Sequence, residues 1–537
     1  MTAGLGKSAF VERRYNRAPQ GIIRRRRFKD GDPGHLFRAG ASCFIASGHR
    51  LISAVRSHAL PAKFEIPLRP MILPLRPPSP VTRLLSSGLA ALALGLSSAT
   101  AADAPAAPAA PAAPAAPPAP TSFKFDFGGK AAPGYVAVTP ATVYSAASGY
   151  GFDLGTKPTA FERGGSDPLH DGFVTSDQPF FFSVDVPEGS YRVTVALGDA
   201  QAESITTIKS ESRRLMLERV RTPAGKFETR TFIANVRNAK VPPPPLNAPG
   251  NDHVELNNRE NGPNGLVLHW DDKLTLEFSD THPSIGAVTI DRVDDLPTVF
   301  VIGDSTVTDQ PREPTTSWGQ MLPRFFKPGV VVANHAESGE TMKSFITELR
   351  LDKVLLQMKK GDYLIMQFGH NDSKANWPQT YVEANTTYKS YLKTFIAEAR
   401  RRGATPVIVN PMQRHQFDGA KVKNSHGDYP EAVRQVAKEE GVAFIDLTAL
   451  SITLMETLGP EKSWVLQSGG RDATHHSAYG AYELAKGIVQ GIRDNKLDLA
   501  KYIVDDFGSF NPAHPDDPDK FDVPASPGRA TQAPRGN

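Results

Sequence analysis

After about residue 121 the chain shows two successive hydrophobic patterns, one over residues 122–295 and another from residue 298 onward. Between residues 122 and 295, short apolar runs alternate with turn residues, and Pro187-Glu188-Gly189 separates two such runs at 180–186 and 191–197. Strand-turn-strand patterns of this kind are typical of antiparallel β-structure. Similar runs lie at 226–236, 266–270, 273–278 and 287–293. The pattern predicts an all-β sandwich domain over residues 122–296.

From residue 298 onward, apolar strands alternate with helices. Predicted strands cover 298–302, 330–333, 362–368, 406–409 and 442–445, and predicted helices cover 381–402 and 477–495. Strands that are apolar on both faces are typical of a parallel sheet with helices on each side. The fold class predicted for residues 297–505 is therefore α/β. Residues 506–537 are rich in Pro and Asp, and we expect a disordered tail or a segment that wraps around the domains.

The first 101 residues differ from the rest in charge. They hold 16 basic and 4 acidic residues, a net charge of +12, whereas residues 102–537 hold 45 basic and 53 acidic residues and carry −8. Residues 1–70 contain Arg24-Arg25-Arg26-Arg27 and show no periodicity. This segment is either a nucleic-acid- or membrane-binding arm or an upstream extension that is non-native or disordered. We favour the extension.

The reason is a second apparent start at Met71. An apolar stretch from Leu84 to Leu96 follows basic residues and precedes Ala99-Thr100-Ala101, which is the layout of a secretory signal peptide over residues 71–101. Cleavage near Ala101 would make the protein secreted or periplasmic, with no membrane attachment. The start codon, Met1 or Met71, stays open. Residues 102–121 repeat Pro-Ala-Ala, so we expect an extended linker there.

Charge and cysteine content narrow the function classes. The acidity of residues 102–537 argues against nucleic acid as a partner, because phosphate binding needs a basic face. The chain has one cysteine, Cys43, which lies before the expected cleavage point. The processed protein would therefore form no disulfide, thiolate metal site or cysteine nucleophile.

Candidate chemistry begins at Gly303-Asp304-Ser305, directly after the first predicted strand of the α/β domain. Open α/β sheets bind their ligands at the carboxyl ends of strands. Ser305 can act there as a nucleophile, but a serine hydroxyl is weak unless a base takes its proton. The tripeptide alone is also a common turn sequence. The assignment therefore depends on three further stretches.

Each of these stretches carries one or two suitable groups. Gly339 follows the second strand and lets the backbone offer its N–H to a ligand. Asn371, in Gly369-His370-Asn371-Asp372, follows the third and can direct its side-chain N–H at developing negative charge. Asp472 and His475 are three residues apart, so the carboxylate can bond one imidazole nitrogen and leave the other for Ser305.

Taken singly, each stretch also has a structural interpretation. Gly339 fits a helix entry, Asn371 and Asp472 fit turn or cap positions, and His475 fits a surface histidine. Together the four stretches are harder to explain in this way. We expect all of them to follow strands and to meet at one edge of the sheet.

In this order the stretches resemble the blocks of the SGNH (GDSL-type) hydrolase family. Flanking residues resemble its rhamnogalacturonan acetylesterase branch, namely Trp318-Gly319, Asn334-His335-Ala336, Ser344-Phe345, Gln367-Phe368 and Gly480-Ala481. The resemblance covers about residues 298–500. Glu340 departs from it, since relatives often carry Arg there. The first domain resembles galactose-binding-like sandwich modules through Phe125-Asp126-Phe127-Gly128 and Gly149-Tyr150-Gly151-Phe152.

The resemblance implies a three-layer α/β/α fold and a serine esterase. Ser305 would attack an ester carbonyl, His475 would accept and return its proton, and Asp472 would orient His475. The oxyanion hole would consist of the Ser305 and Gly339 N–H groups and the Asn371 side chain. No metal and no cofactor is implied.

The implied substrate is an acetylated plant cell-wall polysaccharide, foremost rhamnogalacturonan. Arg414, His415 and Arg471 are candidates for binding an acidic polymer. Tyr150 and Trp270 of the sandwich are candidates for stacking on sugar rings, although core packing explains them equally well. The alternatives are an esterase for xylan or another carbohydrate, a lipase or thioesterase, or an inactive carbohydrate-binding protein. The oligomeric state stays open.

Overall fold

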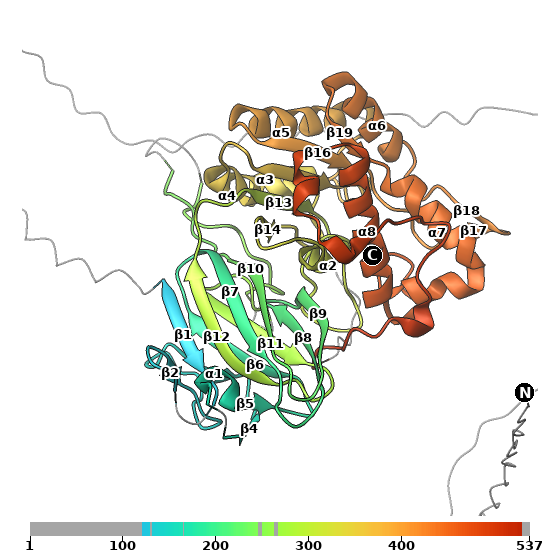
Figure 1. The fold of residues 1–537 in the computed structure, drawn as a ribbon. Helices are drawn as coiled ribbons and strands as arrows, with labels where there is room; N and C mark the ends of the chain where they lie inside the picture. Colours follow the sequence, from blue (N-terminus) through green and yellow to red (C-terminus); the bar gives the residue numbers. More distant parts are fainter. Residues whose placement is uncertain (1–120, 129–130, 165, 245–249, 262–266, 529–537) are drawn as a thin grey trace, which may run out of the picture. The chain divides into compact units, whose positions relative to one another are not determined.

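The structure, a computed structural model, describes residues 121–528 except 129–130, 165, 245–249 and 262–266 (Figure 1). The expected upstream extension, the signal peptide and all but the last residue of the linker lie outside the described residues. None of the helices in the described part of the chain combines the length and the hydrophobicity that a membrane-spanning helix needs.

The first domain consists of two largely antiparallel sheets, as predicted. One sheet has the order β10-β7-β12-β1-β2, with β5 on β12 and β4 on β5, and the other has the order β3-β6-β11-β8-β9. The first comprises β1 (Ser122–Asp126), β2 (Val136–Ala137), β4 (Thr159–Glu162), β5 (Gly172–Thr175), β7 (Gly189–Leu197), β10 (Glu228–Val236) and β12 (Ile285–Arg292). The second comprises β3 (Tyr150–Asp153), β6 (Phe180–Asp185), β8 (Ser204–Ser210), β9 (Arg214–Thr222) and β11 (Lys273–Ser279). A short helix, α1 (Pro168–Asp171), precedes β5.

The core of this domain lies between the two sheets. Phe125 of β1 and Val193 of β7 meet Phe182 of β6 and Leu276 of β11 in one buried cluster. The Phe125 and Phe182 ring centroids are 5.0 Å apart in an edge-to-face arrangement, which favours their packing beyond the area they bury. This aromatic core confirms the predicted sandwich.

The strand predicted at 266–270 is wrong for its described part. Residues 267–270 form no strand, because their side chains turn into a polar cluster. His269 Nδ1 lies 2.6 Å from Ser212 Oγ, and Trp270 Nε1 donates to Glu260 Oε1 over 2.7 Å. The apolar spacing of this stretch reflects burial beside charged groups, which a hydrophobicity pattern does not distinguish from a strand.

The second domain is built on a five-stranded parallel sheet with the order β14-β13-β15-β16-β19. Its strands are β13 (Thr298–Gly303), β14 (Val331–Asn334), β15 (Tyr363–Gln367), β16 (Thr405–Val409) and β19 (Ala443–Ile445). Its helices are α2 (Trp318–Met321), α3 (Met342–Thr347), α4 (Arg350–Gln357), α5 (Lys389–Arg401), α6 (Tyr429–Glu440), α7 (Leu447–Lys462) and α8 (Ala478–Asp494). A small hairpin, β17 (Phe417–Asp418) and β18 (Lys421–Val422), lies between β16 and α6.

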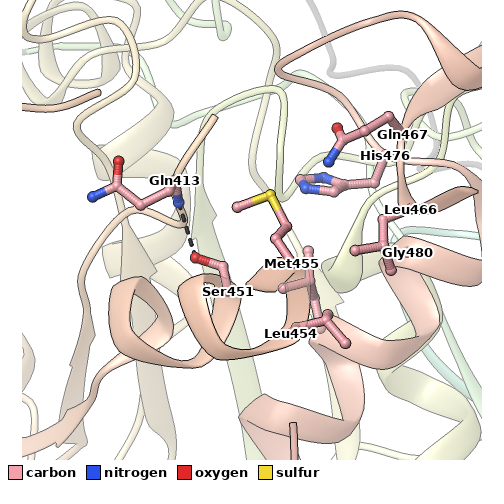
Figure 2. Close-up of a pocket in the computed structure, with 9 residues that line it drawn as sticks. Gln413, Ser451, Leu454, Met455, Leu466, Gln467, His476 and Gly480 are labelled. Atoms are coloured by element: carbon pink, nitrogen blue, oxygen red, sulfur yellow. Dashed lines mark hydrogen bonds between the residues drawn. The ribbon is translucent and has the colours of Figure 1, made fainter. Parts of the chain in front are cut away.

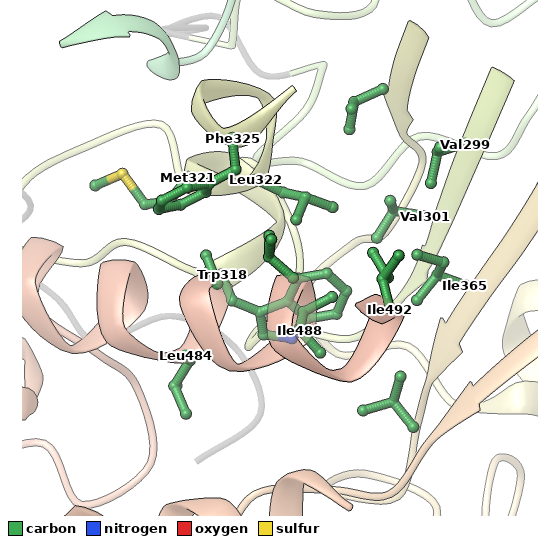
Figure 3. Packing of buried hydrophobic residues seen from close by; sticks show 14 of the residues in the cluster. Val299, Val301, Trp318, Met321, Leu322, Phe325, Ile365, Leu484, Ile488 and Ile492 are labelled. Atoms are coloured by element: carbon green, nitrogen blue, oxygen red, sulfur yellow. The ribbon is translucent and has the colours of Figure 1, made fainter. Parts of the chain in front are cut away.

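Both faces of this sheet are buried, which confirms the α/β/α arrangement. Val299 and Val301 of β13 pack against Trp318 of α2 and Ile488 of α8 (Figure 3). The alternate residues of β13 point to the other face, where α3, α4, α5 and α6 contribute a second cluster. A strand apolar on both sides therefore places its carboxyl end between two helical layers.

The helix predicted from residue 381 begins later. Its α-helical part starts at Lys389 and follows a π-helical turn at Ala384–Tyr388. The Glu383 carboxylate accepts hydrogen bonds from the backbone N–H of Thr386 (2.8 Å) and from its hydroxyl (2.7 Å). This cap fixes the start of the element, because it satisfies an N–H group that the first turn leaves without an intrahelical partner.

The described C-terminal residues wrap back onto the sandwich, the second of the two expectations for them. Ser526 Oγ donates to the Glu277 carboxylate of β11 over 2.7 Å and accepts from Lys209 Nζ of β8 over 2.9 Å. The Ser526 N–H also donates to Glu313 of the α/β domain over 3.2 Å. Apolar contact adds to this link, since Leu215 of β9 lies fully buried in the α/β core.

Candidate active site

Ser305 occupies a tight turn directly after β13. A Cβ on Gly303 would lie 2.4 Å from the carbonyl oxygen of Gln367 on β15, so only glycine permits this approach of the two strands. The Asp304 carboxylate accepts from the Thr306 N–H over 3.0 Å and lies 3.2 Å from His370 Nδ1. Burial would raise the pKa of Asp304, but His370 and Thr306 lower it to about 2. An ionised Asp304 therefore holds the shape of the turn.

The three residues predicted as a triad form a continuous chain of contacts. His475 Nε2 lies 2.8 Å from Ser305 Oγ, and His475 Nδ1 lies 2.9 Å from Asp472 Oδ2. Ser305 and His475 are buried. Burial opposes ionisation of Asp472, but its hydrogen bond and charge interaction with His475 lower its pKa well below the usual range. An ionised carboxylate, an imidazole and a serine hydroxyl in this order can move a proton from oxygen to nitrogen.

The Asp472–His475 turn does not directly follow a strand, contrary to expectation. It follows α7 and two 3-10 turns, and α8 begins three residues after His475. Backbone hydrogen bonds hold it from three sides: Thr316 N donates to His476 O, Ser468 N to His475 O, and His415 N to Ala473 O. The histidine is therefore placed by neighbouring loops and not by the sheet itself.

A small cavity lined mostly by apolar side chains adjoins this turn (Figure 2). His476 and Gln467 line it together with Leu454 and Met455 of α7. Turned so that its nitrogen faces the backbone, the Gln467 amide lies 3.1 Å from the carbonyl oxygens of Asp472 and His475. Burial and the neighbouring His475 lower the pKa of His476 to about 3. His476 is thus a neutral packing residue beside the turn.

The two other predicted blocks meet through Asn371. Gly339 has φ +89°, a left-handed conformation that favours glycine. Asn371 Nδ2 donates to the carbonyl of Glu340, the next residue, over 3.0 Å. An amide carries two N–H groups, and this bond uses one of them. The loops that follow β14 and β15 are thereby joined.

Asp372 strengthens the same junction. Its carboxylate oxygens accept from the backbone N–H groups of Met342 and Gly369, each over 2.9 Å. Burial raises the pKa of Asp372 to about 7. The residue links the start of α3 to the loop after β15, and so it supports the position of Gly339.

The residues predicted to bind substrate occupy different environments. Arg414 is half-buried, and its guanidinium donates to the His370 carbonyl over 3.2 Å and to the Thr474 hydroxyl. His415 is buried, with Nε2 2.9 Å from Ser463 Oγ and its ring stacked on Trp464 at 3.7 Å. Arg471 is exposed. His415 supports the catalytic turn through these contacts. Arg414 and Arg471 stay candidates for substrate contact.

The two aromatic candidates of the sandwich have contacts within the protein. The ring centroid of Tyr150 lies 4.9 Å from that of Phe125. The Trp270 ring is covered by Arg237, whose guanidinium carbon lies 4.5 Å from the ring centroid. Core packing therefore accounts for Tyr150, as the alternative interpretation held, and contacts with Arg237 and Glu260 account for Trp270.

Two glutamines to which the sequence analysis assigned no role hold the nucleophile turn. Gln310 Nε2 donates to the carbonyl of Ser305 over 2.7 Å, and Gln367 Nε2 donates to Thr306 Oγ1 over 2.7 Å. Gln367 lies at the start of a recognised block, which is the signal that points to it. Gln310 lies in a loop without a motif.

The fold and the site together define a serine hydrolase of the three-layer α/β/α type. The family model described as GDSL-like Lipase/Acylhydrolase matches residues 301–481. The model described as Beta-agarase/YXIM esterase-like, galactose-binding domain-like matches residues 123–213. Rhamnogalacturonan acetylesterase RhgT of Bacillus subtilis (strain 168) is 39% identical over 221 residues, which are 38% of this chain and 94% of that protein.

A second relative spans both domains. Uncharacterized esterase YxiM of the same strain is 26% identical over 386 residues, 69% of this chain and 90% of that protein. An X-ray crystal structure of the YxiM protein of Bacillus subtilis covers 70% of this chain and 99% of its own, with 24% identity and a TM-score of 0.37. This chain belongs to the GDSL-like lipase/acylhydrolase family, and it is a carboxylic ester hydrolase with a galactose-binding-like domain.

Proposed function

We propose that this protein is an exported acetylesterase that removes acetyl groups from the plant cell-wall polysaccharide rhamnogalacturonan. The observation that carries the chemistry is the chain of contacts from Asp472 through His475 to Ser305 at the edge of the sheet. The named activity of RhgT supports the choice of substrate, because the match with this chain covers 94% of RhgT.

The reaction proceeds in two half-reactions. Ser305 Oγ bonds to the acetyl carbonyl carbon while its proton passes to His475 Nε2. The resulting oxyanion is stabilised by the N–H groups of Ser305 and Gly339 and by Asn371. The carbon–oxygen bond to the sugar then breaks, and the sugar oxygen takes the proton from His475. Water, deprotonated by His475, attacks the acetyl-Ser305 ester and releases acetate with the serine restored.

Positive charge near the site supports an acidic polymer. Arg414 bridges the backbone of His370 and the side chain of Thr474, which places it between two blocks of the site. Lys374 lies three residues after Asn371, and its ammonium is 4.2 Å from the Trp377 ring centroid. Burial and the charge of Arg414 lower the pKa of Lys374 to about 8. Uronate carboxylates of a pectin backbone would complement this pair of cations.

Acetate release from three substrates tests the substrate class. Wild-type protein is expected to release acetate from acetylated rhamnogalacturonan faster than from acetylated xylan, and to hydrolyse a small aryl acetate as well. Lys374→Met should lower the rate of acetate release from the pectin. Its rate on the aryl ester should stay within about twofold of the wild-type rate. Equal rates on xylan, or hydrolysis of the aryl ester alone, would contradict the pectin assignment while leaving the esterase in place.

Export is supported by the basic start, apolar stretch and small-residue site of residues 71–101. Expression with a native secretion system is expected to give an extracellular or periplasmic protein whose N-terminus lies near Ala102. Intact-mass measurement of the exported protein decides this. A mass that includes Met1 or Met71 would contradict cleavage at this site.

A further inference from the structure

We propose that Arg259, which lies in a loop of the sandwich domain, is a positioning residue of the hydrolase active site. It would hold the nucleophile turn and the loop that contains Gly339 in a fixed relation. The inference rests on the proposed use of Ser305 and Gly339 in ester hydrolysis, and it does not depend on which polymer carries the ester.

The guanidinium of Arg259 contacts both loops. Arg259 Nη1 donates to Gln310 Oε1 over 3.0 Å, and Gln310 Nε2 in turn donates to the carbonyl of Ser305 over 2.7 Å. Arg259 Nη2 forms an ion pair with Glu337, two residues before Gly339. The Glu337 N–H donates to the carbonyl of Gly303 over 3.1 Å. One planar side chain thus reaches the backbone of the nucleophile through Gln310 and the Gly339 loop through Glu337.

The buried carboxylate of Glu337 depends on Arg259 for charge compensation. Its side chain is fully buried, whereas that of Arg259 is 20% exposed. Asn257 Nδ2 and Thr308 Oγ1 also donate to its carboxylate, over 3.2 and 3.3 Å. Burial would raise the pKa of Glu337, but the charges of Arg259 and Arg350 lower it. Loss of Arg259 would leave an ionised, buried carboxylate with weaker compensation directly before the oxyanion loop, which favours movement of that loop.

The loop that carries Arg259 is itself anchored on the α/β domain. Arg350, the first residue of α4, forms an ion pair with Glu260 over 2.7 Å, and both side chains are buried. The Glu255 N–H donates to the carbonyl of Glu348 over 3.0 Å. Asn257 Oδ1 accepts from the Arg259 N–H over 2.9 Å. These bonds orient Arg259 before any substrate arrives, as a positioning role requires.

Two neighbouring arginines of the sandwich contact the chain that follows the nucleophile, and within the described residues their hydrogen bonds and ion pairs do not reach Glu337. Arg214 Nε donates to Asp309 Oδ2 over 2.7 Å, and Arg213 Nη1 donates to the carbonyl of Gln310 over 3.1 Å. Among the hydrogen bonds and ion pairs of the described residues, Arg259 is the sandwich arginine that also pairs with Glu337. Substitution of Arg259 therefore distinguishes a positioning role in the active site from a general contribution to contact between the two domains.

The same region offers a set of metal-ligand types, but its geometry favours ion pairs. Glu260, His269 and Glu337 each place one potential ligand atom within 4.8 Å of the others. The oxygens of both carboxylates already accept hydrogen bonds, mainly from Arg350 and Arg259. Burial and four surrounding arginines lower the pKa of His269 far below its usual value. This concentration of positive charge disfavours a bound cation.

The family does not always have a sandwich in this position. The match with RhgT covers 94% of that protein but 38% of this chain, so RhgT is about as long as the α/β domain alone. The match with YxiM covers both domains. Support of the Gly339 loop by a second domain is therefore not available to a protein of the length of RhgT, and in this chain it gives the sandwich a role besides polymer contact.

Kinetics of full-chain Arg259 variants on a small aryl acetate test the proposal. Arg259→Ala is expected to lower kcat by about 10- to 100-fold, because displaced oxyanion donors cost that much. KM should change little, and the pH midpoint of kcat/KM should not move, because the contact does not involve His475. Arg259→Lys should have a kcat between those of Arg259→Ala and wild type, because a single ammonium group can contact Gln310 or Glu337 but not both at once. Arg221→Ala serves as the matched control: Arg221 is an exposed sandwich arginine paired with Glu203, and its loss should leave kcat within twofold.

A double variant and a covalent probe complete the test. Arg259→Met/Glu337→Gln removes both charges together, so it avoids the unpaired carboxylate and should fold while kcat stays low. Labelling of Ser305 by a fluorophosphonate should slow in parallel, and this readout requires no ester substrate.

A folded Arg259→Ala with wild-type kcat and labelling rate would overturn the proposal. A loss of kcat equal to the unfolded fraction of Arg259→Ala, measured by circular dichroism, would also overturn it. A double variant with wild-type kcat would do the same. Absence of wild-type hydrolysis together with slower labelling of Arg259→Ala would refute the proposed function and leave the positioning role standing.

Discussion

Ser305→Ala is expected to lower kcat for an acetate ester by roughly 10⁶-fold. The variant removes the hydroxyl oxygen that lies 2.8 Å from His475 Nε2, so no acetyl-enzyme forms. What remains is hydrolysis by water aided by the oxyanion donors, which typically exceeds the uncatalysed rate by 10³- to 10⁴-fold. Substrate binding should survive, because the serine hydroxyl is a small part of the contact. Acetate release and isothermal titration with a deacetylated oligosaccharide measure the two properties separately.

Ser390→Ala is the matched control for this prediction. Ser390 is an exposed serine of α5 whose hydroxyl donates to Thr386 O over 3.0 Å. Its loss should leave kcat unchanged. Because Ser305 and His475 act as one unit, the double variant Ser305→Ala/His475→Ala should be no slower than Ser305→Ala alone. Residual activity of Ser305→Ala above one per cent would show that another group is the nucleophile.

Asp472→Asn is expected to lower kcat by about 10⁴-fold while KM changes little. The amide can donate to His475 Nδ1, which places the imidazole proton on the nitrogen that faces Ser305. The base is then lost although the geometry is kept. Asp418→Asn, at an exposed aspartate of β17, provides the control. A decrease of less than tenfold would mean that Asp472 orients His475 without being needed as a carboxylate.

The pH dependence of this variant follows from the lowered pKa of Asp472. A carboxylate whose folded-state pKa is depressed stabilises the native state above its unfolded value of about 3.9, and this contribution is lost as the pH falls further. Wild type is therefore expected to be more stable than Asp472→Asn at pH 7, with the difference shrinking in acid. Urea unfolding at pH 7 and pH 3 measures this. Across pH 5–9 Asp472 stays ionised, so its titration does not contribute to the rate profile in this range.

The sequence was informative where one local rule decides the structure. Val299 and Val301 alternate with residues that are also apolar, so a strand buried on both faces was the only consistent interpretation. The apolar run stops at Gly303, which marked the point where the chain turns. Spacing alone brought Asp472 within reach of His475. These features need no knowledge of distant parts of the chain.

Prediction failed where distant contacts satisfy polar groups. β8 and β9 escaped notice because they carry buried charges such as Lys209 and Arg214, whose partners lie far away in the sequence. The apolar stretch before Asp271 was taken for a strand, although its aromatic residue covers Arg237. Arg259 lies in a loop with no motif, and its partner Glu337 is 78 positions further along the chain. Local propensity contains no information on such pairs.

The contacts of Ser526 also impose an order on the assembly of the sandwich. Lys209 and Glu277 are synthesised with the sandwich, but Ser526, which bonds to both, is synthesised only after the α/β domain. Until then the charged groups of Lys209 and Glu277 lack the hydroxyl that bonds to both in the folded protein. These hydrogen bonds can therefore form only after the whole α/β domain has been synthesised. A chain that stops short of residue 526 loses them even though every residue of the catalytic site is present.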